Sequence, residues 1–280
     1  PVERPLLLRV GDTLIIHAEN RPGEPAREDA DGLVIEPAHI ACQQPEVFQY
    51  LSPGEPISLN DGKISGVIAE VDEDQIEVEI TKAKPTGSRL RGHRGINFPE
   101  SDIKLAGLTA TDKTNLEFVA QHADAVSLSF VRKPGDVRLL HEELDRLGAD
   151  KLGLVIKVET KKGFKSLPKV ILYAMRRYPI GVMIARGDLA VECDWTRLAE
   201  LQERILWICD AARVPVIWAT QVLENEAKKG LPSRAEITDA AESQRADCVM
   251  LNKGPHILAA IRTLDSILRS MQKLRRSKSS

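Results

Sequence analysis

Five short apolar runs rich in β-branched residues recur through the second part of this 280-residue chain, at residues 125–131, 152–158, 180–185, 215–220 and 248–251. They are separated by segments with helical spacing of apolar residues, at the roughly 30–35-residue repeat of parallel βαβ units. The pattern predicts an α/β fold. An eight-stranded (β/α) barrel needs about 250 residues, so five units correspond to part of such a barrel or to an open sheet.

The first part of the chain, up to about residue 98, has a different pattern. Short segments with apolar residues at alternate positions are separated by turns, as around Asn60-Asp61-Gly62 and in 75–82. Strand, Asp-Gly turn and strand together are typical of a β-hairpin. We therefore expect residues 1–98 to form a small all-β domain, barrel-like in form.

Composition excludes several classes of function. The 39 basic and 41 acidic residues leave a net charge of −2, and aromatic residues make up only 4%. This balance predicts neither nucleic-acid nor membrane-surface binding. No apolar run reaches the about 20 residues of a membrane span, and four scattered cysteines are typical of a reduced, cytoplasmic protein. Because the chain starts at Pro1 rather than methionine, we expect a processed, truncated or partial product.

Charged residues follow two of the apolar runs, where parallel strands end and where α/β proteins bind ligands. Lys157 and Glu159 are two residues apart, so on a strand they point to the same face. Asp188 follows the next run. One Lys and two carboxylates at one edge could hold a divalent metal and stabilise a phosphoryl group or an enolate.

Seven motifs occur in order along the chain and together resemble the pyruvate kinase family: Arg94-Gly95-Ile96-Asn97-Phe98-Pro99, Leu108-Thr109-Ala110-Thr111-Asp112-Lys113, Ser129-Phe130-Val131-Arg132, Lys157-Val158-Glu159, Ala185-Arg186-Gly187-Asp188-Leu189, Ala219-Thr220-Gln221-Val222-Leu223-Glu224 and Ser233-Arg234-Ala235-Glu236. Several ordered motifs are far more specific than any one of them.

The resemblance implies a domain assignment. Residues 1–98 correspond to the family's lid domain, 99–274 to barrel units four to eight, and 275–280 to a flexible basic tail. The family's first three barrel strands and its C-terminal regulatory domain have no counterpart here. The resemblance implies phosphoryl transfer from phosphoenolpyruvate to ADP, giving pyruvate and ATP. We expect residues 1–280 alone to be weakly active or inactive, and to form a homo-oligomer or associate with a missing N-terminal barrel segment.

The resemblance also assigns roles to individual residues. Glu159 and Asp188 would hold Mg²⁺ or Mn²⁺, and K⁺ is a possible second cation. Lys157 would neutralise the transferring phosphoryl group and the enolate, and Thr220 would assist proton delivery. Gly187, Ser129 and Arg186 would bind the substrate. For Arg186, a structural role in an ion pair is favoured over a catalytic one. Nucleotide binding falls to Asp61 and Arg94.

Each assignment has an ordinary structural alternative. Glu159 could pair with a surface lysine, Asp188 could cap a short helix, and Asp61 could be a simple turn residue. Lys253, in Asn252-Lys253-Gly254, replaces a carboxylate of the family motif, and its charge could partly substitute for K⁺. Two other functions stay open: a non-catalytic regulatory or interaction protein, and a related metal-dependent, enolate-forming enzyme acting on another keto acid.

Overall fold

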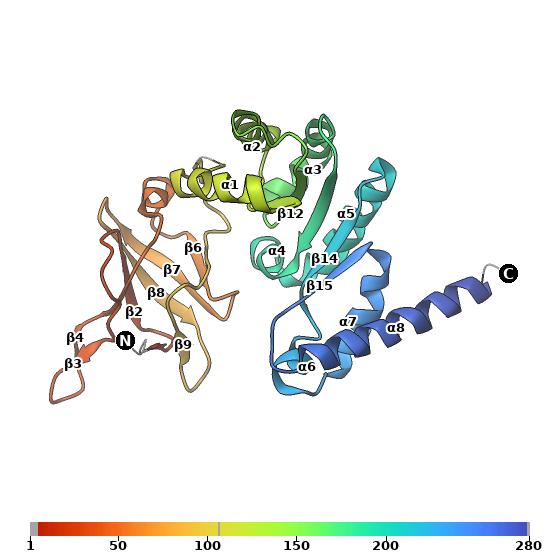
Figure 1. The fold of residues 1–280 in the computed structure, drawn as a ribbon. Helices are drawn as coiled ribbons and strands as arrows, with labels where there is room; N and C mark the ends of the chain where they lie inside the picture. Colours follow the sequence, from red (N-terminus) through yellow and green to blue (C-terminus); the bar gives the residue numbers. More distant parts are fainter. Residues whose placement is uncertain (1–4, 106, 279–280) are drawn as a thin grey trace. The chain divides into compact units, whose positions relative to one another are not determined.

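The computed structural model describes residues 5–105 and 107–278, with side chains up to Leu274. The chain divides into two compact units, Pro1–Ala106 and Gly107–Ser280 (Figure 1). Each unit has its own hydrophobic core. None of the helices in the described part has the length and apolar character needed to cross a lipid bilayer.

The first unit is built from strands and one 3₁₀ helix. Its main sheet has the order β10-β6-β7-β8-β2-β5, and β1 pairs with β9 and β3 with β4 in two small sheets. The main sheet has two ends, β10 and β5, so the expected barrel-like form is found as an open, mixed sheet. The elements are β1 (Leu6–Leu8), β2 (Thr13–His17), β3 (Arg27–Glu28), β4 (Val34–Glu36), β5 (Ala38–Ala41), η1 (Pro45–Tyr50), β6 (Pro56–Leu59), β7 (Ile64–Val71), β8 (Gln75–Lys82), β9 (Ser88–Leu90) and β10 (Ile96–Asn97).

Alternation in sequence becomes alternation in burial in this unit. Along β8, Ile76, Val78 and Ile80 are completely buried, whereas Gln75 and Glu79 are exposed. This is the expected result of a strand that covers a core with one face only. The predicted hairpin is present, since β6 and β7 pair antiparallel around the turn that contains Asp61.

The second unit is a parallel α/β structure. Its strands pair in chain order, β11-β12-β13-β14-β15, every pair parallel. The α/β class with five β/α units is thus confirmed. The elements are α1 (Ala110–His122), β11 (Ala125–Leu128), α2 (Pro134–Arg146), β12 (Gly153–Val158), α3 (Lys161–Ala174), β13 (Ile180–Ala185), α4 (Arg186–Cys193), η2 (Trp195–Arg197), α5 (Leu198–Ala212), β14 (Val216–Val222), α6 (Glu224–Lys229), α7 (Arg234–Glu242), η3 (Ser243–Arg245), β15 (Cys248–Leu251) and α8 (Ile257–Lys278).

Burial follows the position of each strand in this sheet. All six residues of the central strand β13 are buried, as in a strand covered on both faces. The outer strands β11 and β15 are more exposed, with a single buried residue in β11 and none in β15. Helices α2, α3 and α5 pack side by side, α3 against β12 and α5 against β13 (Figure 1).

Helix starts follow local capping chemistry. Thr109 precedes the helical spacing of residues 110–121, and its type and position predict an N-cap. It caps α1 as predicted, accepting a hydrogen bond from the Asp112 N–H, while the Asp112 carboxylate accepts from the Thr109 N–H. The sequence of residues 167–177 predicts a helix that begins at Leu167, and this predicted start is wrong. Helix α3 begins at Lys161, because Thr160 accepts a hydrogen bond from the Gly163 N–H and Phe164 adds to the buried face.

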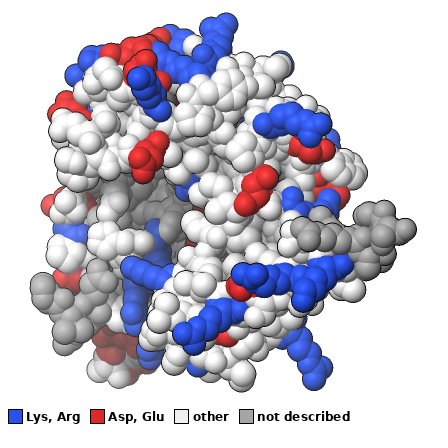
Figure 2. Space-filling view, turned by 45° about the vertical axis from the view of Figure 1, so that its right-hand side comes forward, with Lys and Arg blue, Asp and Glu red and all other residues white. Residues whose placement is uncertain are grey.

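The C-terminal helix is longer than expected. Apolar residues keep helical spacing at Ala260, Leu264 and Ile267, and α8 runs to Lys278. The region expected as a flexible tail, 275–280, therefore begins inside this helix, and its last two residues lie outside the described part. Acidic and basic side chains both spread over the face seen in Figure 2, in keeping with the small net charge.

Candidate active site

The carboxyl ends of β11 and β12 bring three of the predicted site residues together. Lys157, near the end of β12, donates from Nζ to the Ser129 Oγ at 2.8 Å. The same Nζ lies 2.7 Å from Oε1 of Glu159, which immediately follows the strand. The expectation that Lys157 and Glu159 share a face is confirmed by this contact.

Glu159 is held inside the fold. Only 2% of its side chain is exposed, and its second oxygen, Oε2, accepts a hydrogen bond from the Phe130 N–H at 2.5 Å. Phe130 has a φ of 51°, a left-handed conformation that is uncommon for a bulky residue. The loop after β11 thus presents its backbone N–H to the carboxylate, a contact that the sequence motif alone does not reveal.

Helix α4 begins at the end of β13 with no intervening loop. Arg186, Gly187 and Asp188 form its first turn, where backbone N–H groups lack helical partners and negative charge is favoured. Asp188 is half-buried and Gly187 is half-buried. An eight-residue helix in this position offers the N–H groups of its first turn to an anion at the sheet edge.

Thr220 lies next to this first turn. A methyl group added at Gly187 would sit 3.4 Å from the Thr220 Oγ1, with no other atom within 4 Å. The Thr220 hydroxyl and the Gly187 Cα are therefore neighbours, although they come from different strand ends. Strand β14, which carries Thr220, pairs with β13 up to the Ala185–Ala219 pair.

Arg186 does not point into open space. Its Nε donates to the Ala219 carbonyl at 3.2 Å, its Nη2 donates to the Thr220 carbonyl, and both terminal nitrogens bind the Asp239 carboxylate. The guanidinium also lies over the Trp218 ring, 5.0 Å from its centre. These contacts agree with an ion-pairing scaffold role, and they occupy the groups with which Arg186 would otherwise bind a substrate.

The strand register puts these groups on one edge of the sheet. Leu128 pairs with Ile156, Val158 with Ile184, and Ala185 with Ala219. Ser129, Glu159 and Arg186 therefore follow directly after three adjacent strands, and Thr220 lies near the end of the fourth strand, β14, at a similar level. Lys253 follows the fifth strand, β15, and is exposed. The next residue, Gly254, packs so closely on α6 that an added methyl group would lie 2.1 Å from the Ala227 carbonyl oxygen.

The carboxylates suit a metal only in part. Within residues 5–105 and 107–278, no group of three or more His, Cys, Asp or Glu side chains is placed to hold a metal ion. Mg²⁺ is commonly bound by one or two carboxylates, with water and substrate oxygens completing its shell. Glu159 keeps acceptor capacity for that mode, since a carboxylate has about four lone-pair sites and Glu159 uses two of them within the chain.

The two predicted nucleotide-binding residues belong to the first unit. Asp61 lies in the β6–β7 turn with a φ of 56°, and its carboxylate is 3.9 Å from the Lys63 Nζ. Arg94 is exposed. The neighbouring residues are joined, because the Asn60 N–H donates to the Gly95 carbonyl at 3.0 Å. The structure therefore brings the segments of Asp61 and Arg94 together.

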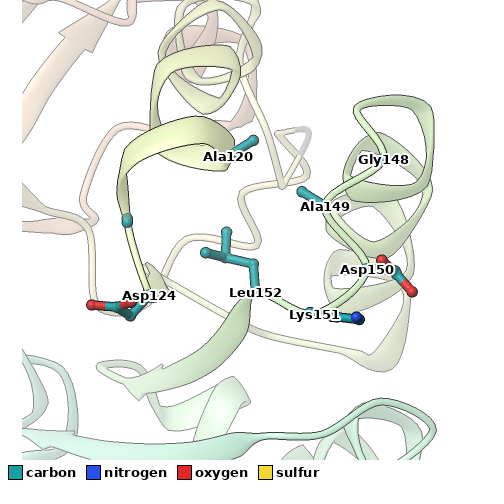
Figure 3. A pocket seen from close by; sticks show the side chains of 8 residues that line it. Ala120, Asp124, Gly148, Ala149, Asp150, Lys151 and Leu152 are labelled. Carbon is teal, nitrogen blue, oxygen red and sulfur yellow. The ribbon is translucent and has the colours of Figure 1, made fainter.

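A pocket of about 430 Å³ lies at the other edge of the sheet (Figure 3). Asp124 and Leu152, which line it, immediately precede β11 and β12, so it opens at the amino ends of these strands. Lys157, Glu159, Asp188 and Thr220 do not line this pocket. Because ligands of parallel α/β sheets bind at the carboxyl edge, we place the candidate site there and not in this pocket.

Fold and site together define a class: a parallel (β/α) unit of barrel type with a charged carboxyl edge. The sequence model of the pyruvate kinase barrel domain matches residues 24–255. The chain belongs to the pyruvate kinase family, and the match confirms that its α/β unit is a portion of a barrel.

Individual relatives agree with this assignment. The chain is 31% identical to pyruvate kinase 2 of Candida glabrata over 226 residues, covering 78% of this chain and 42% of the relative. It is 31% identical to pyruvate kinase of Thermotoga maritima over 227 residues, covering 79% and 47%. With pyruvate kinase of Methylorubrum extorquens the identity is 28% over 274 residues, covering 95% and 52%. The chain thus spans about half the length of the curated relatives it matches.

Proposed function

We propose that this chain carries the part of a pyruvate kinase active site that handles the metal, the enolate and its proton. The reaction would move a phosphoryl group from the enol oxygen of phosphoenolpyruvate to ADP, after which the enolate takes a proton at its terminal carbon and leaves as pyruvate. The observation that carries the proposal is the contact of Lys157 with both Glu159 and Ser129 at the carboxyl edge. We include a cytoplasmic location, which the four free thiols support.

Lys157 is suited to stabilise negative charge on the substrate. Its side chain is 23% exposed, and it comes from a strand in which four of the six residues are buried. Phosphoryl transfer needs positive charge held in position, and Ser129 and Glu159 hold the ammonium from two sides. Lys157 would therefore interact with the transferring phosphoryl group and with the enolate oxygen.

Glu159 and Asp188 would hold the divalent cation, with substrate oxygens and water completing its shell. When bound, Mg²⁺ or Mn²⁺ supplies further positive charge beside the phosphoryl and enolate oxygens. A role of K⁺ is part of the family resemblance. Lys253, in the loop after β15, would supply a positive charge that partly substitutes for K⁺. The first-turn N–H groups of α4 at Gly187 would orient the substrate carboxylate.

Thr220 is suited to the proton step because its hydroxyl lies beside Gly187, where the substrate carboxylate would bind. A hydroxyl both donates and accepts, so it can pass a proton from water to the enolate carbon. Asp61 and Arg94, in the first unit, would contribute to nucleotide binding, with Arg94 offering a guanidinium to phosphate oxygens. Arg186 would act on the substrate only through the backbone that it holds.

Two measurements test the proposal. Mn²⁺ titration followed by electron paramagnetic resonance should show one bound ion, with binding weakened more than about 10-fold by Glu159→Gln or by Asp188→Asn. Asp210→Asn, a change on the exposed end of α5, serves as control. A lactate-dehydrogenase-coupled assay of residues 1–280 should show weak turnover or none. Robust turnover would overturn the expectation that residues 1–280 alone are weakly active or inactive, and equal Mn²⁺ binding by all variants would overturn the metal assignment.

A non-catalytic role is the second candidate. It is favoured by one observation: both oxygens of Glu159 already have partners within the chain, Lys157 and the Phe130 N–H. If the unmutated chain bound no Mn²⁺ at all, this non-catalytic role would be favoured. A keto-acid enzyme of another specificity would instead bind Mn²⁺ and decarboxylate oxaloacetate, which can be followed by pyruvate release.

A further inference from the structure

The end of β14, which carries Thr220, has an irregular backbone. The pairing with β15 shifts register between Trp218 and Val222. Gln221 and Leu223 have φ values of 60° and 47°, in the left-handed region that non-glycine residues seldom adopt. Such conformations persist only where the surroundings hold them. Something outside the strand must therefore fix the backbone on which the Thr220 hydroxyl depends.

Arg186 holds this backbone from the neighbouring strand end. It donates to two successive carbonyls, those of Ala219 and Thr220, and it stacks on Trp218, which is 1% exposed. A planar guanidinium can bind acceptors in several directions at once. Arg186 itself is 9% exposed, so its charge needs a partner inside the fold.

Asp239 is that partner. It comes from α7 and binds the two terminal nitrogens of Arg186 through its two oxygens, with the Nη2–Oδ2 distance at 2.9 Å. This two-point contact fixes the plane of the guanidinium as well as its charge.

Helix α7 is itself anchored, so Asp239 has little freedom. Glu236 accepts hydrogen bonds from the N–H of Ser233, the residue whose hydroxyl caps the helix, and from the backbone N–H and side-chain amide of Asn225. Asn225 lies in α6, which starts immediately after the irregular end of β14. The segment from Thr220 to Asn225 is thus held at both ends, by Arg186 at the start and by Glu236 at the finish.

We propose that Asp239 is a positioning residue of the active site: it fixes Arg186, which holds the Ala219 and Thr220 carbonyls and so sets the Thr220 hydroxyl beside Gly187. Asp239 acts through Arg186 and touches neither substrate nor metal. The inference rests on the proposed function, because it assigns the purpose of this network to the proton step at Thr220.

The first test measures the proton step by itself. Residues 1–280 with Mn²⁺ and pyruvate are placed in deuterated water, and loss of the pyruvate methyl protons is followed by NMR. Asp239→Asn keeps the shape of the side chain and removes its charge. We expect exchange to slow by about 100-fold, the effect of a displacement of about 1 Å, with little change in the pyruvate concentration that gives half the maximal rate. Asp239→Glu should restore part of the rate.

A matched control separates positioning from general loss of an ion pair. Glu203 binds both terminal nitrogens of Arg245 in the same two-point manner, between α5 and η3. Glu203→Gln removes a comparable pair with no link to Thr220. Its exchange rate should stay within about threefold of that of the parent chain, because a surface ion pair contributes little to stability and this one does not contact the site. Equal slowing by Glu203→Gln and Asp239→Asn would overturn the proposal.

A second readout does not depend on activity. Amide hydrogen exchange of Gln221, Val222 and Leu223 should speed up in Asp239→Asn and remain unchanged in Glu203→Gln. If Asp239→Asn does not fold, Arg186→Lys serves instead, because Lys keeps the charge but cannot bind both carbonyls and the carboxylate. Unchanged protection at these amides in a folded variant would overturn the proposal. The parent chain could also fail to exchange the pyruvate protons while Asp239→Asn still shows the predicted faster amide exchange. That outcome would contradict the proposed function and would support the role of Asp239 in holding the backbone.

Discussion

The ammonium of Lys157 and the carboxylate of Glu159 form an ion pair of 2.7 Å in which the two partners are unequally buried. The Glu159 side chain is 2% exposed and that of Lys157 is 23% exposed. Lys157 can reach water without its partner, whereas Glu159 cannot. The two halves of the pair should therefore respond differently to mutation.

Lys157→Met should destabilise the chain more than Glu159→Gln. The first change leaves a buried carboxylate without a cation, at a cost of about 3 kcal/mol. The second leaves a lysine that can turn to solvent, and Gln keeps an acceptor for the Phe130 N–H, so we expect a loss of about 1 kcal/mol or less. The double variant should recover most of the loss of Lys157→Met. Urea unfolding followed by tryptophan fluorescence measures this, because Trp195, Trp207 and Trp218 all lie in the second unit. A larger loss for Glu159→Gln would contradict the burial argument.

Gly187→Ala should separate stability from anion binding. The added methyl group meets only the Thr220 Oγ1, at an ordinary 3.4 Å, and Ala favours a helix over Gly by up to about 1 kcal/mol. The methyl group would nevertheless crowd the N–H groups proposed to bind the substrate carboxylate. We expect unchanged or higher stability and more than about 10-fold weaker oxalate binding in the presence of Mn²⁺, measured by calorimetry. Gly135→Ala, also in the first turn of a helix, is the control and should leave oxalate binding unchanged.

The anchoring of α7 predicts an acid-sensitive contribution from Glu236. Burial of this carboxyl opposes ionisation, but hydrogen bonds from Ser233 and Asn225 outweigh it and hold the pKa of Glu236 below its usual value. A carboxyl with a lowered folded-state pKa stabilises the fold above its unfolded pKa, and that contribution is lost as pH falls through the folded pKa. The gap in unfolding free energy between the parent chain and Glu236→Gln should thus be full at pH 7 and narrow below about pH 4. A gap independent of pH would rule out this role.

The first unit should lose stability at mildly acidic pH because of His17. Burial, opposed in part by the hydrogen bond to the Glu19 carbonyl, lowers the pKa of this imidazole, and Arg21 and His39 add to the lowering. The groups facing it are the Glu19 carbonyl, Arg21 and, from β5, the His39 ring, 3.1 Å away. A lowered His pKa means that the unfolded chain takes up the proton first, so stability falls as pH drops below about 6.5.

This prediction is checked by denaturant unfolding at pH 7.5, 6.5 and 5.5, followed at the methyl signals of Ile16 and Ile40. His17→Gln should flatten the pH dependence at both signals. His122→Gln, at the exposed end of α1, should not. Retention of the full pH dependence in His17→Gln would show that another group is responsible.

Elements with a strong period were predictable from sequence. The bounds of β13 and β15 match the apolar runs, and α1 starts at the predicted cap. Helix α4 was not predicted as an element, because Arg186-Gly187-Asp188 has no apolar period and a glycine within it. It forms because the chain leaves β13 directly into a helical turn that buries Leu189 and Ala190. The spacing of apolar residues predicts a helix or strand only where the segment is long enough for the spacing to repeat.

Some contacts of the candidate site could likewise be predicted from the sequence, and others could not. Lys157 and Glu159 are related by strand geometry, so their contact follows from their spacing. Asp239 is 53 residues from Arg186 and lies outside the family motifs, so the sequence does not indicate that the two residues pair. The hydrogen bond from Phe130 to Glu159 comes from a backbone N–H, so the residue type at position 130 does not indicate it. Contacts between segments distant in sequence, and contacts to backbone groups, are not predictable from the sequence alone.

We propose that Glu159 and Asp188 hold one divalent cation at the carboxyl edge of the sheet, with Lys157 and Thr220 beside the bound substrate. Paramagnetic broadening of amide signals by Mn²⁺, recorded by NMR on residues 1–280, tests this directly. We predict broadening of Ser129, Gly187 and Thr220, lost in Glu159→Gln, with sharp signals for Asp124 and Leu152 at the opposite edge. Broadening centred on Asp124 and Asp150, or unaffected by Glu159→Gln, would contradict the claim.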